Sequence, residues 1–229
     1  MASPTNDPDE TDSSAPQVAH RGATESLVDA TRALIATQRM ADAPFEALER
    51  AAALVREATE LLAPHQVDGV PGQNALRAMY PDREQFATGD PARFFPYSPV
   101  VGPLNAIAPP VVFTFDGERM HGSGTLDAPY TGPPGTVHGG VVALVLDELL
   151  GAVNACLGLG AYTGTLTIRY ERPTPIGEEL AFDAWVDRTE GRKVFTVGTI
   201  SADGTVTARA DGVFIRVEAP VAIDRAAST

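Results

Sequence analysis

The sequence predicts an α+β fold in which a curved antiparallel β-sheet wraps one long central helix, with a helical extension at the N-terminus. Three observations lead to this class. A single apolar stretch of helical length covers residues 139–157. Six short stretches with strand character surround it, two before and four after it. Two amphipathic helical patterns precede all of them, within residues 23–64.

The strand candidates are separated by turn residues rather than by further helices. Residues 111–126 suit two strands joined at Asp116-Gly117, a dipeptide typical of tight turns. Between the four later candidates, Pro173, Pro175 and two Xaa-Gly pairs favour hairpins over βαβ crossovers. These four candidates cover residues 163–170, 180–188, 193–200 and 206–217. We therefore expect a four-strand meander after the helix.

Composition divides the chain into five segments. They are a disordered acidic tail at 1–22, a helical hairpin at 23–64, a Pro- and aromatic-rich connecting segment at 65–110, the main domain at 111–218 and a flexible C-terminal tail at 219–229. In the hairpin, the second helix begins near Asp42, a plausible cap just ahead of Pro44. Its apolar face must be covered by the main domain or by a partner chain. This face comprises Phe45, Leu48, Ala52, Val55 and Leu62.

The overall composition excludes several classes of protein. Acidic residues number 30 against 17 basic ones, a formal charge of −13, which argues against nucleic-acid binding. One cysteine allows neither an internal disulfide nor a cysteine-built metal site. The most apolar window, residues 141–159, contains Asp147 and Glu148, so a core helix is expected there and no membrane insertion. The polar, acidic N-terminus lacks the pattern of a secretory signal, and we expect a cytoplasmic protein.

The start and the middle of the apolar helix hold the candidate site. Gly139 and Gly140 have low helix propensity, but they let backbone amides approach a ligand at the positive end of the helix dipole. Asp147 is a carboxylate in otherwise apolar surroundings. Eight residues separate Gly139 from Asp147, or about 12 Å along one helix. A shared reaction therefore requires two antiparallel copies of the helix, which predicts a homodimer, with a homotetramer as the larger alternative.

Three spaced motifs resemble a known family. HGGVVALVLDELLG at 138–151, YTGTLTIRYERPTPIG at 162–177 and EGRKVF at 190–195 occur in the order seen in the PaaI-like acyl-CoA thioesterases, which have the hotdog fold. The resemblance covers about residues 98–217 and leaves out the N-terminal segments. It implies a hotdog thioesterase domain, acyl-CoA as the substrate, hydrolysis to a free acid and CoA, no metal or redox cofactor, and a role in fatty acid metabolism.

The resemblance also implies roles for individual residues. Gly139 supplies the oxyanion amide, and Asp147 of the partner subunit acts as base or nucleophile. Thr163, at the start of the next strand, assists the aspartate or its water. His138 is a positioning residue. The choice between a general base and an acyl-enzyme route stays open.

Further residues are candidates for substrate binding, and two positions depart from the family pattern. An acidic protein that binds CoA needs local cations for the phosphates. The substrate-binding candidates are Gly140, Arg169, Arg192 and Lys193. Many relatives carry an asparagine where this chain has Gly132, and often a basic residue where it has Glu171.

Two other functions fit the same fold. One is an enoyl-thioester hydratase or dehydratase, although the hydratase motif YDxNPxH is absent from the sequence. The other is a non-catalytic acyl-CoA-binding dimer module. Water addition to crotonyl-CoA would identify the first, and tight binding of acyl-CoA without release of CoA would identify the second.

Overall fold

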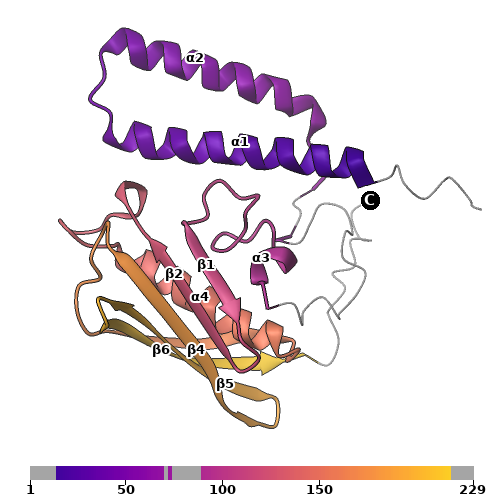
Figure 1. The fold of residues 1–229 in the computed structure, drawn as a ribbon, viewed down its shortest axis with the longest axis vertical. Coiled ribbons are helices and arrows are strands. Elements are labelled where there is room, and N and C mark those ends of the chain that lie inside the picture. Colours follow the sequence, from indigo (N-terminus) through magenta and orange to yellow (C-terminus); the bar gives the residue numbers. More distant parts are fainter. Residues whose placement is uncertain (1–13, 70–71, 74–88, 218–229) are drawn as a thin grey trace, which may run out of the picture.

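The computed structural model describes residues 14–69, 72–73 and 89–217 of the 229-residue chain. Helices come first, and the sheet with its central helix follows (Figure 1). The elements of the N-terminal part are α1 (Ser14–Met40), α2 (Phe45–Leu62), η1 (Ala63–His65) and α3 (Pro91–Phe94). Those of the main domain are β1 (Val111–Phe115), β2 (Arg119–Thr125), η3 (Ala128–Tyr130), α4 (Gly139–Cys156), β3 (Ala161–Tyr170), β4 (Glu179–Glu190), β5 (Lys193–Ala202) and β6 (Thr205–Arg216). This order confirms the α+β prediction.

The six strands form one antiparallel sheet with the order β1-β2-β4-β5-β6-β3. The predicted four-strand meander is wrong at its first strand, because β3 pairs with β6 and not with β4. The connection that carries Pro173 and Pro175 crosses to β4 instead of forming a hairpin. It is tied to the segment before α4, where the Val137 amide donates to the Thr174 carbonyl at 2.9 Å and Thr136 bridges to Pro175.

Helix α4 packs against one face of the curved sheet (Figure 1). Within the described residues it is the one helix long and apolar enough to cross a membrane, and its apolar side is buried in the core. Two glycines of the sheet allow this close approach: a Cβ at Gly198 or Gly212 would lie 2.7 or 2.8 Å from the Leu150 methyl groups. The fully buried helix residues include Val145, Leu146, Leu149, Leu150 and Val153.

The two N-terminal helices form the expected hairpin beside the main domain (Figure 1). Helix α1 begins at Ser14, inside the segment predicted as a disordered tail; residues 1–13 and 219–229 lie outside the described residues. Val28 of α1 is buried, and the Arg32 guanidinium donates to the carbonyls of Gly102 and Asn105 at 3.1 and 2.8 Å. These contacts attach α1 to the connecting segment.

Helix α2 differs from the prediction at its start, and of the two predicted covers for its apolar face the main domain is not the one present. Pro44 is the N-cap residue and no side chain caps the helix, so Asp42 does not have the predicted role. No residue of α2 is buried. Its predicted apolar face is therefore not covered by the main domain, and Phe45, Leu48, Val55 and Leu62 are all exposed.

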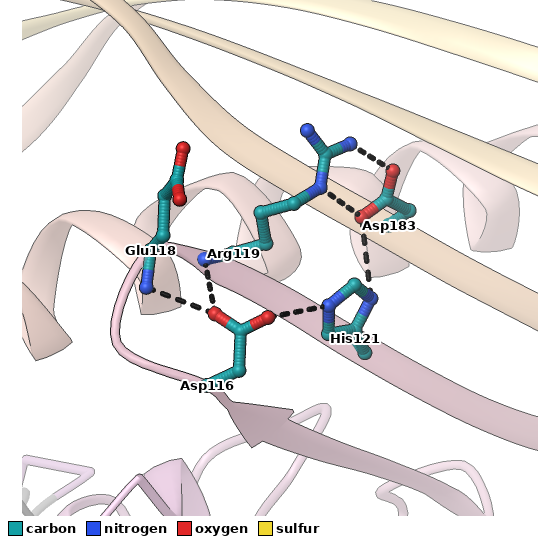
Figure 2. A network of polar contacts seen from close by, with 5 residues as sticks. All are labelled: Asp116, Glu118, Arg119, His121 and Asp183. Atoms are coloured by element: carbon teal, nitrogen blue, oxygen red, sulfur yellow. Dashed lines mark hydrogen bonds and ion pairs between the residues drawn. The ribbon is translucent and has the colours of Figure 1, made fainter.

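A charged network stabilises the outer face of the sheet, opposite α4 (Figure 2). The Asp183 carboxylate lies between Arg119, which binds it with two nitrogen atoms, and His121. The other ring nitrogen of His121 lies 2.9 Å from Asp116, whose pKa is lowered to about 2, mainly by the backbone amides of the β1–β2 turn. The Arg119 guanidinium also lies over Trp185, 3.9 Å from the ring centroid. The network joins the turn and β2 to β4.

Candidate active site

The first turn of α4 leaves one backbone donor without a partner. His138 is the N-cap residue, and its Nδ1 accepts a hydrogen bond from the Gly140 amide at 3.0 Å. The His138 carbonyl accepts from the amides of Val141 and Val142. Within the described residues the Gly139 amide forms no hydrogen bond. An unpaired amide at the positive end of a helix dipole is suited to stabilise an oxyanion.

Hydrogen bonds determine the tautomer of His138 and hold the carbonyl of Gly139 in this turn. Because Nδ1 of His138 accepts a hydrogen bond, the neutral ring carries its proton on Nε2. The Tyr170 hydroxyl, from the end of β3, donates to the Gly139 carbonyl at 2.9 Å. A Cβ at Gly139 would touch only the Tyr170 ring, at 3.6–3.7 Å, which is ordinary van der Waals contact. The protein itself thus has room for a side chain at Gly139, and the space above it is open for a ligand.

Asp147 lies two turns further along α4 and is held from β3. The Thr163 hydroxyl donates to its Oδ1 at 2.9 Å. The register of β3 against β6 shifts between Thr163 and Thr165, which marks a β-bulge. Bulges re-aim side chains and are common next to active sites. The hydrogen bond leaves the second carboxylate oxygen of Asp147 available, and the side chain is half-buried.

Glu148, next to Asp147, is half-buried and contacts the connecting segment. Its Oε1 accepts from the Ser98 hydroxyl at 2.6 Å. Ser98 in turn accepts from the amides of Val100 and Val101. Burial raises the pKa of Glu148, while the Ser98 hydrogen bond lowers it and the charge of Asp147 raises it further. This arrangement attaches the connecting segment to the helix beside the candidate site.

The predicted site residues fall into two groups within one chain. His138, Gly139 and Gly140 lie at the helix start, about 12 Å along the helix from Asp147 and Thr163. The cationic candidates do not converge either. Arg169 lies opposite Arg209 near the C-terminal end of β3. Arg192 ends the turn between β4 and β5 and Lys193 begins β5, at the end of the sheet where β3 begins but separated from β3 by β6.

The two departures from the family pattern have structural explanations. A Cβ at Gly132 would lie 2.8 Å from the His138 Cα, so an asparagine would require this loop to shift. Glu171 forms an ion pair with Arg209 at 2.7 Å and is therefore neutralised. Neither departure disturbs the contacts of Gly139 or Asp147 described above.

Sequence reasoning missed the roles of Tyr170 and Ser98. In the sequence, the role of Tyr170 was indicated only by its hydroxyl group at the end of a strand face that otherwise carries Leu166 and Ile168. Ser98 lies 50 residues from Glu148, and nothing in the sequence pairs them. Within the described part of the chain, no group of three or more His, Cys, Asp or Glu side chains is placed to hold a metal ion.

Comparison with known proteins agrees with this geometry. Residues 134–208, which include the turn before α4, Asp147 and Thr163, match the Thioesterase superfamily family. Acyl-coenzyme A thioesterase THEM4 of Xenopus laevis is 39% identical over 88 residues, 38% of this chain and 40% of that protein. Acyl-coenzyme A thioesterase THEM5 of Homo sapiens is 30% identical over 89 residues, 38% of this chain and 36% of that protein. The matches thus span about two-fifths of these relatives.

A solved structure gives a longer match. The crystal structure of a thioesterase superfamily protein superposes with a TM-score of 0.71 and 33% identity, covering 84% of this chain and 90% of that one. Residues 89–229 alone cannot supply that coverage, so the likeness extends into the N-terminal part. Together with the hotdog arrangement of sheet and helix, this match establishes that the chain belongs to the thioesterase superfamily.

Proposed function

We propose that this protein hydrolyses acyl-CoA thioesters to a free carboxylic acid and CoA, at sites shared between two subunits. One observation carries the proposal: α4 presents at its start a Gly139 amide that has no partner among the described residues, and a hydrogen-bonded Asp147 eight residues later. The relatives THEM4 and THEM5 are acyl-coenzyme A thioesterases, which supports the same reaction.

The Gly139 amide would polarise the thioester carbonyl. As a nucleophile attacks, negative charge develops on the carbonyl oxygen, and a preorganised amide stabilises the charge more in the transition state than in the ground state. One such donor is worth about 3–4 kcal/mol of barrier in other acyl-transfer enzymes. The helix dipole acts in the same direction. The Tyr170 hydroxyl donates a hydrogen bond to the carbonyl of Gly139 and so holds the peptide group that follows the Gly139 amide.

Asp147 would activate the nucleophile. As a general base, its carboxylate takes a proton from water while the water oxygen attacks the thioester carbon. The C–S bond then breaks, and the departing thiolate receives the proton, which yields the acid and CoA. In the alternative route the carboxylate attacks the thioester carbon, the C–S bond breaks and CoA leaves as the thiolate; water then hydrolyses the resulting anhydride, which restores the carboxylate, releases the acid and supplies the proton that the thiolate takes up. Thr163 orients the carboxylate in both routes through its 2.9 Å hydrogen bond.

A homodimer completes the site. Gly139 and Asp147 are about 12 Å apart on one rigid helix, too far to contact one carbonyl group. Strand β3 supports association, because within the described residues it pairs only with β6 and leaves a ten-residue edge unpaired. Long unpaired edges favour pairing with another chain. Pairing of two dimers would give the tetramer.

Substitution of Asp147 tests the reaction. Asp147→Asn keeps the shape of the side chain but removes the base and the nucleophile, and we expect turnover of an acyl-CoA series, measured by release of free thiol, to fall by about 10²–10⁴. Thr163→Ala should lose less. Asp203→Asn is the matched control, since Asp203 lies in the exposed β5–β6 turn with a φ of +45°, which asparagine tolerates. Hydration of crotonyl-CoA without thiol release would contradict the proposal, as would acyl-CoA binding without turnover.

A heterodimer tests whether the site is shared. One chain carries Asp147→Asn and the other Gly139→Leu, so that one of the two sites receives both changes and the other receives none. About half of the parent activity should survive, although each variant homodimer is nearly inactive. Loss of nearly all activity, with substrate binding retained, would mean that both residues act within one subunit.

A further inference from the structure

Helix α2 carries an apolar stripe that no other described residue covers. The stripe has the alternating spacing of three and four residues that defines a heptad repeat, so its members lie along one side of the helix for about 27 Å. They are Phe45, Leu48, Ala52, Val55, Thr59 and Leu62. The four large side chains are exposed, from 43% for Val55 to 67% for Phe45. Because α1 lies between α2 and the main domain, the main domain leaves the stripe uncovered (Figure 1).

The one polar side chain in the stripe already has a hydrogen-bond partner. The Thr59 hydroxyl donates to the Val55 carbonyl of the preceding turn at 2.9 Å. It therefore needs neither water nor a polar partner across the stripe. A continuous apolar surface of this length on an exposed helix is typical of a contact with another protein.

A single neighbouring helix cannot cover all the apolar side chains of α2. A second series with the same spacing lies beside the stripe, and both of its leucines are exposed. This series comprises Ala47, Ala51, Leu54, Ala58 and Leu61. At about 100° per residue the two series together span about 200° of the helix circumference. Helix α1 of the same chain can cover one side of α2, and the other side requires a helix from a second chain.

The charges that flank the stripe are self-complementary. Glu49 and Arg56 lie on the same flank, seven residues apart. When two copies of α2 lie antiparallel with Ala52 opposite Val55 of the partner subunit, Glu49 of each copy lies beside Arg56 of the partner subunit. The two-fold arrangement thus forms two ion pairs. Among the described residues, neither Glu49 nor Arg56 has an ion-pair partner within its own chain.

Other partners of this stripe fit the charges less well. In a parallel pair of α2 helices, Arg56 would lie beside Ala51 of the partner subunit and form no ion pair. A helix that binds an anionic lipid surface carries Lys and Arg on its polar face. Helix α2 has four glutamates, two arginines and no lysine. A second, antiparallel copy of α2 is therefore the occupant that the charges favour.

We propose that α2 pairs with α2 of a second copy of this chain in an antiparallel contact with two-fold symmetry. This contact goes beyond the proposed reaction, because no residue of α2 belongs to the candidate active site. It uses neither α4 nor the unpaired edge of β3. The hairpin therefore provides a second interface through which chains associate.

Sedimentation velocity of the full chain over a range of concentrations tests the contact with two matched variants. Ala52→Glu places a charge at the centre of the stripe, and Ala53→Glu makes the same change on the charged side of the helix. A buried, unpaired charge is costly, so we expect Ala52→Glu to raise the dissociation constant of the assembly by at least about tenfold. Ala53→Glu should associate like the parent. An unchanged dissociation constant in Ala52→Glu would overturn the proposal.

Charge reversal tests the antiparallel register without placing a charge in the stripe. Glu49→Arg and Arg56→Glu each bring like charges together across the pair, so each should weaken association by roughly fivefold. Glu49→Arg makes the acidic chain less negative, so weaker association in this variant cannot come from general repulsion. The double variant restores opposite charges and should associate like the parent. Losses that add in the double variant, or single variants that associate like the parent, would overturn the proposal.

Circular dichroism of the same variants identifies a cover from within the chain. If α1 of the same chain covers the stripe, Ala52→Glu should lower the Tm by an amount independent of protein concentration and leave the sedimenting mass unchanged. That result would overturn the proposal. For a contact between chains, the loss of Tm should grow as the protein is diluted.

Turnover separates this contact from the proposed reaction. At concentrations where sedimentation still detects a dimer, Ala52→Glu should hydrolyse acyl-CoA at the parent rate per chain. Failure of the parent to hydrolyse any acyl-CoA, with association still weakened by Ala52→Glu, would contradict the proposed function alone. Normal turnover in the parent, with association unaffected by Ala52→Glu, would contradict the α2 pair alone.

Discussion

The Tyr170 hydroxyl links the end of β3 to the peptide group that begins α4. Its hydrogen bond to the Gly139 carbonyl polarises the Gly139–Gly140 peptide, whose amide in turn donates to His138. These bonds determine how the first turn presents the Gly139 amide to a ligand. Tyr170 is therefore a positioning residue in the proposed reaction.

Tyr170→Phe removes this hydrogen bond and keeps the aromatic ring. A neutral hydrogen bond contributes about 1 kcal/mol, so we expect kcat to fall by roughly fivefold with little change in KM. Steady-state kinetics of acyl-CoA hydrolysis measure both. Tyr162→Phe on the same strand is the control, because Tyr162 is 63% exposed. Equal kcat values in the two variants would contradict the positioning role.

Glu148 predicts a dependence of stability on pH. Burial raises its pKa above the ordinary value of 4.5, so the folded protein holds this proton more tightly than the unfolded chain does. Its contribution to stability is complete below pH 4.5 and is lost as pH rises through the raised folded-state pKa. Glu148→Gln stays neutral and can still accept the Ser98 hydrogen bond, so we expect its Tm to gain on the parent between pH 4 and pH 7.

Scanning calorimetry at several pH values measures this difference. Glu60→Gln on the exposed helix α2 provides the control and should show no such trend. A constant difference in Tm between Glu148→Gln and the parent over the pH range would mean that burial does not govern the ionisation of Glu148.

At the residue scale, the sequence could indicate candidate site residues only where their relation depends on local spacing. Gly139 and Asp147 lie on one helix, and Thr163 follows it at the start of the next strand. Their relative positions could therefore be predicted from the sequence. The contacts of Ser98 and Tyr170 depend on tertiary packing between segments far apart in the chain. No local pattern distinguishes Ser98 from other serines in irregular segments, or Tyr170 from other tyrosines at strand ends.

At the scale of elements, Arg32 attaches α1 to the connecting segment, and Val28 of the same helix is buried. Arg32→Ala should remove two charge-assisted hydrogen bonds and leave the carbonyls of Gly102 and Asn105 without this donor. Such bonds contribute about 1.5–3 kcal/mol each, so we expect the hairpin to detach more often. Limited proteolysis between α1 and α2 should become at least about tenfold faster.

Arg39→Ala, at the exposed end of the same helix, is the control for this experiment. The calorimetric Tm of the sheet should change little in either variant, because the core around α4 is untouched. Cleavage rates that are the same for Arg32→Ala and the parent would mean that other contacts attach the hairpin.

The identity of each strand was more predictable than its place in the sheet. Alternation of apolar and polar residues, together with turn dipeptides, indicated all six strands within a few residues. The order of strands depends on long-range pairing, and the proline-containing connection after β3 gave a misleading signal. That connection is held by the segment before α4, as the Val137–Thr174 hydrogen bond shows. The helices α1 and α2 were likewise predictable, but the absence of burial along α2 was not.

At the scale of the whole molecule, the proposed shared site predicts that only a dimer is active. We expect specific activity to fall on dilution over the same concentration range in which sedimentation velocity detects dissociation of the dimer. The reason is that a separated chain holds Gly139 and Asp147 too far apart to contact one thioester. A sedimenting monomer with undiminished specific activity would contradict the shared site.

The stacking of Arg119 on Trp185 also determines what optical spectroscopy can detect. Trp185 is the only tryptophan in the chain, and it lies in β4 on the face of the sheet opposite α4. Intrinsic tryptophan emission therefore reports the environment of β2 and β4. We expect it to respond little to ligands bound beside α4, because Trp185 lies on the other face of the sheet. An unfolding curve followed by emission will register loss of the sheet, and movement of the hairpin requires an introduced fluorophore or circular dichroism.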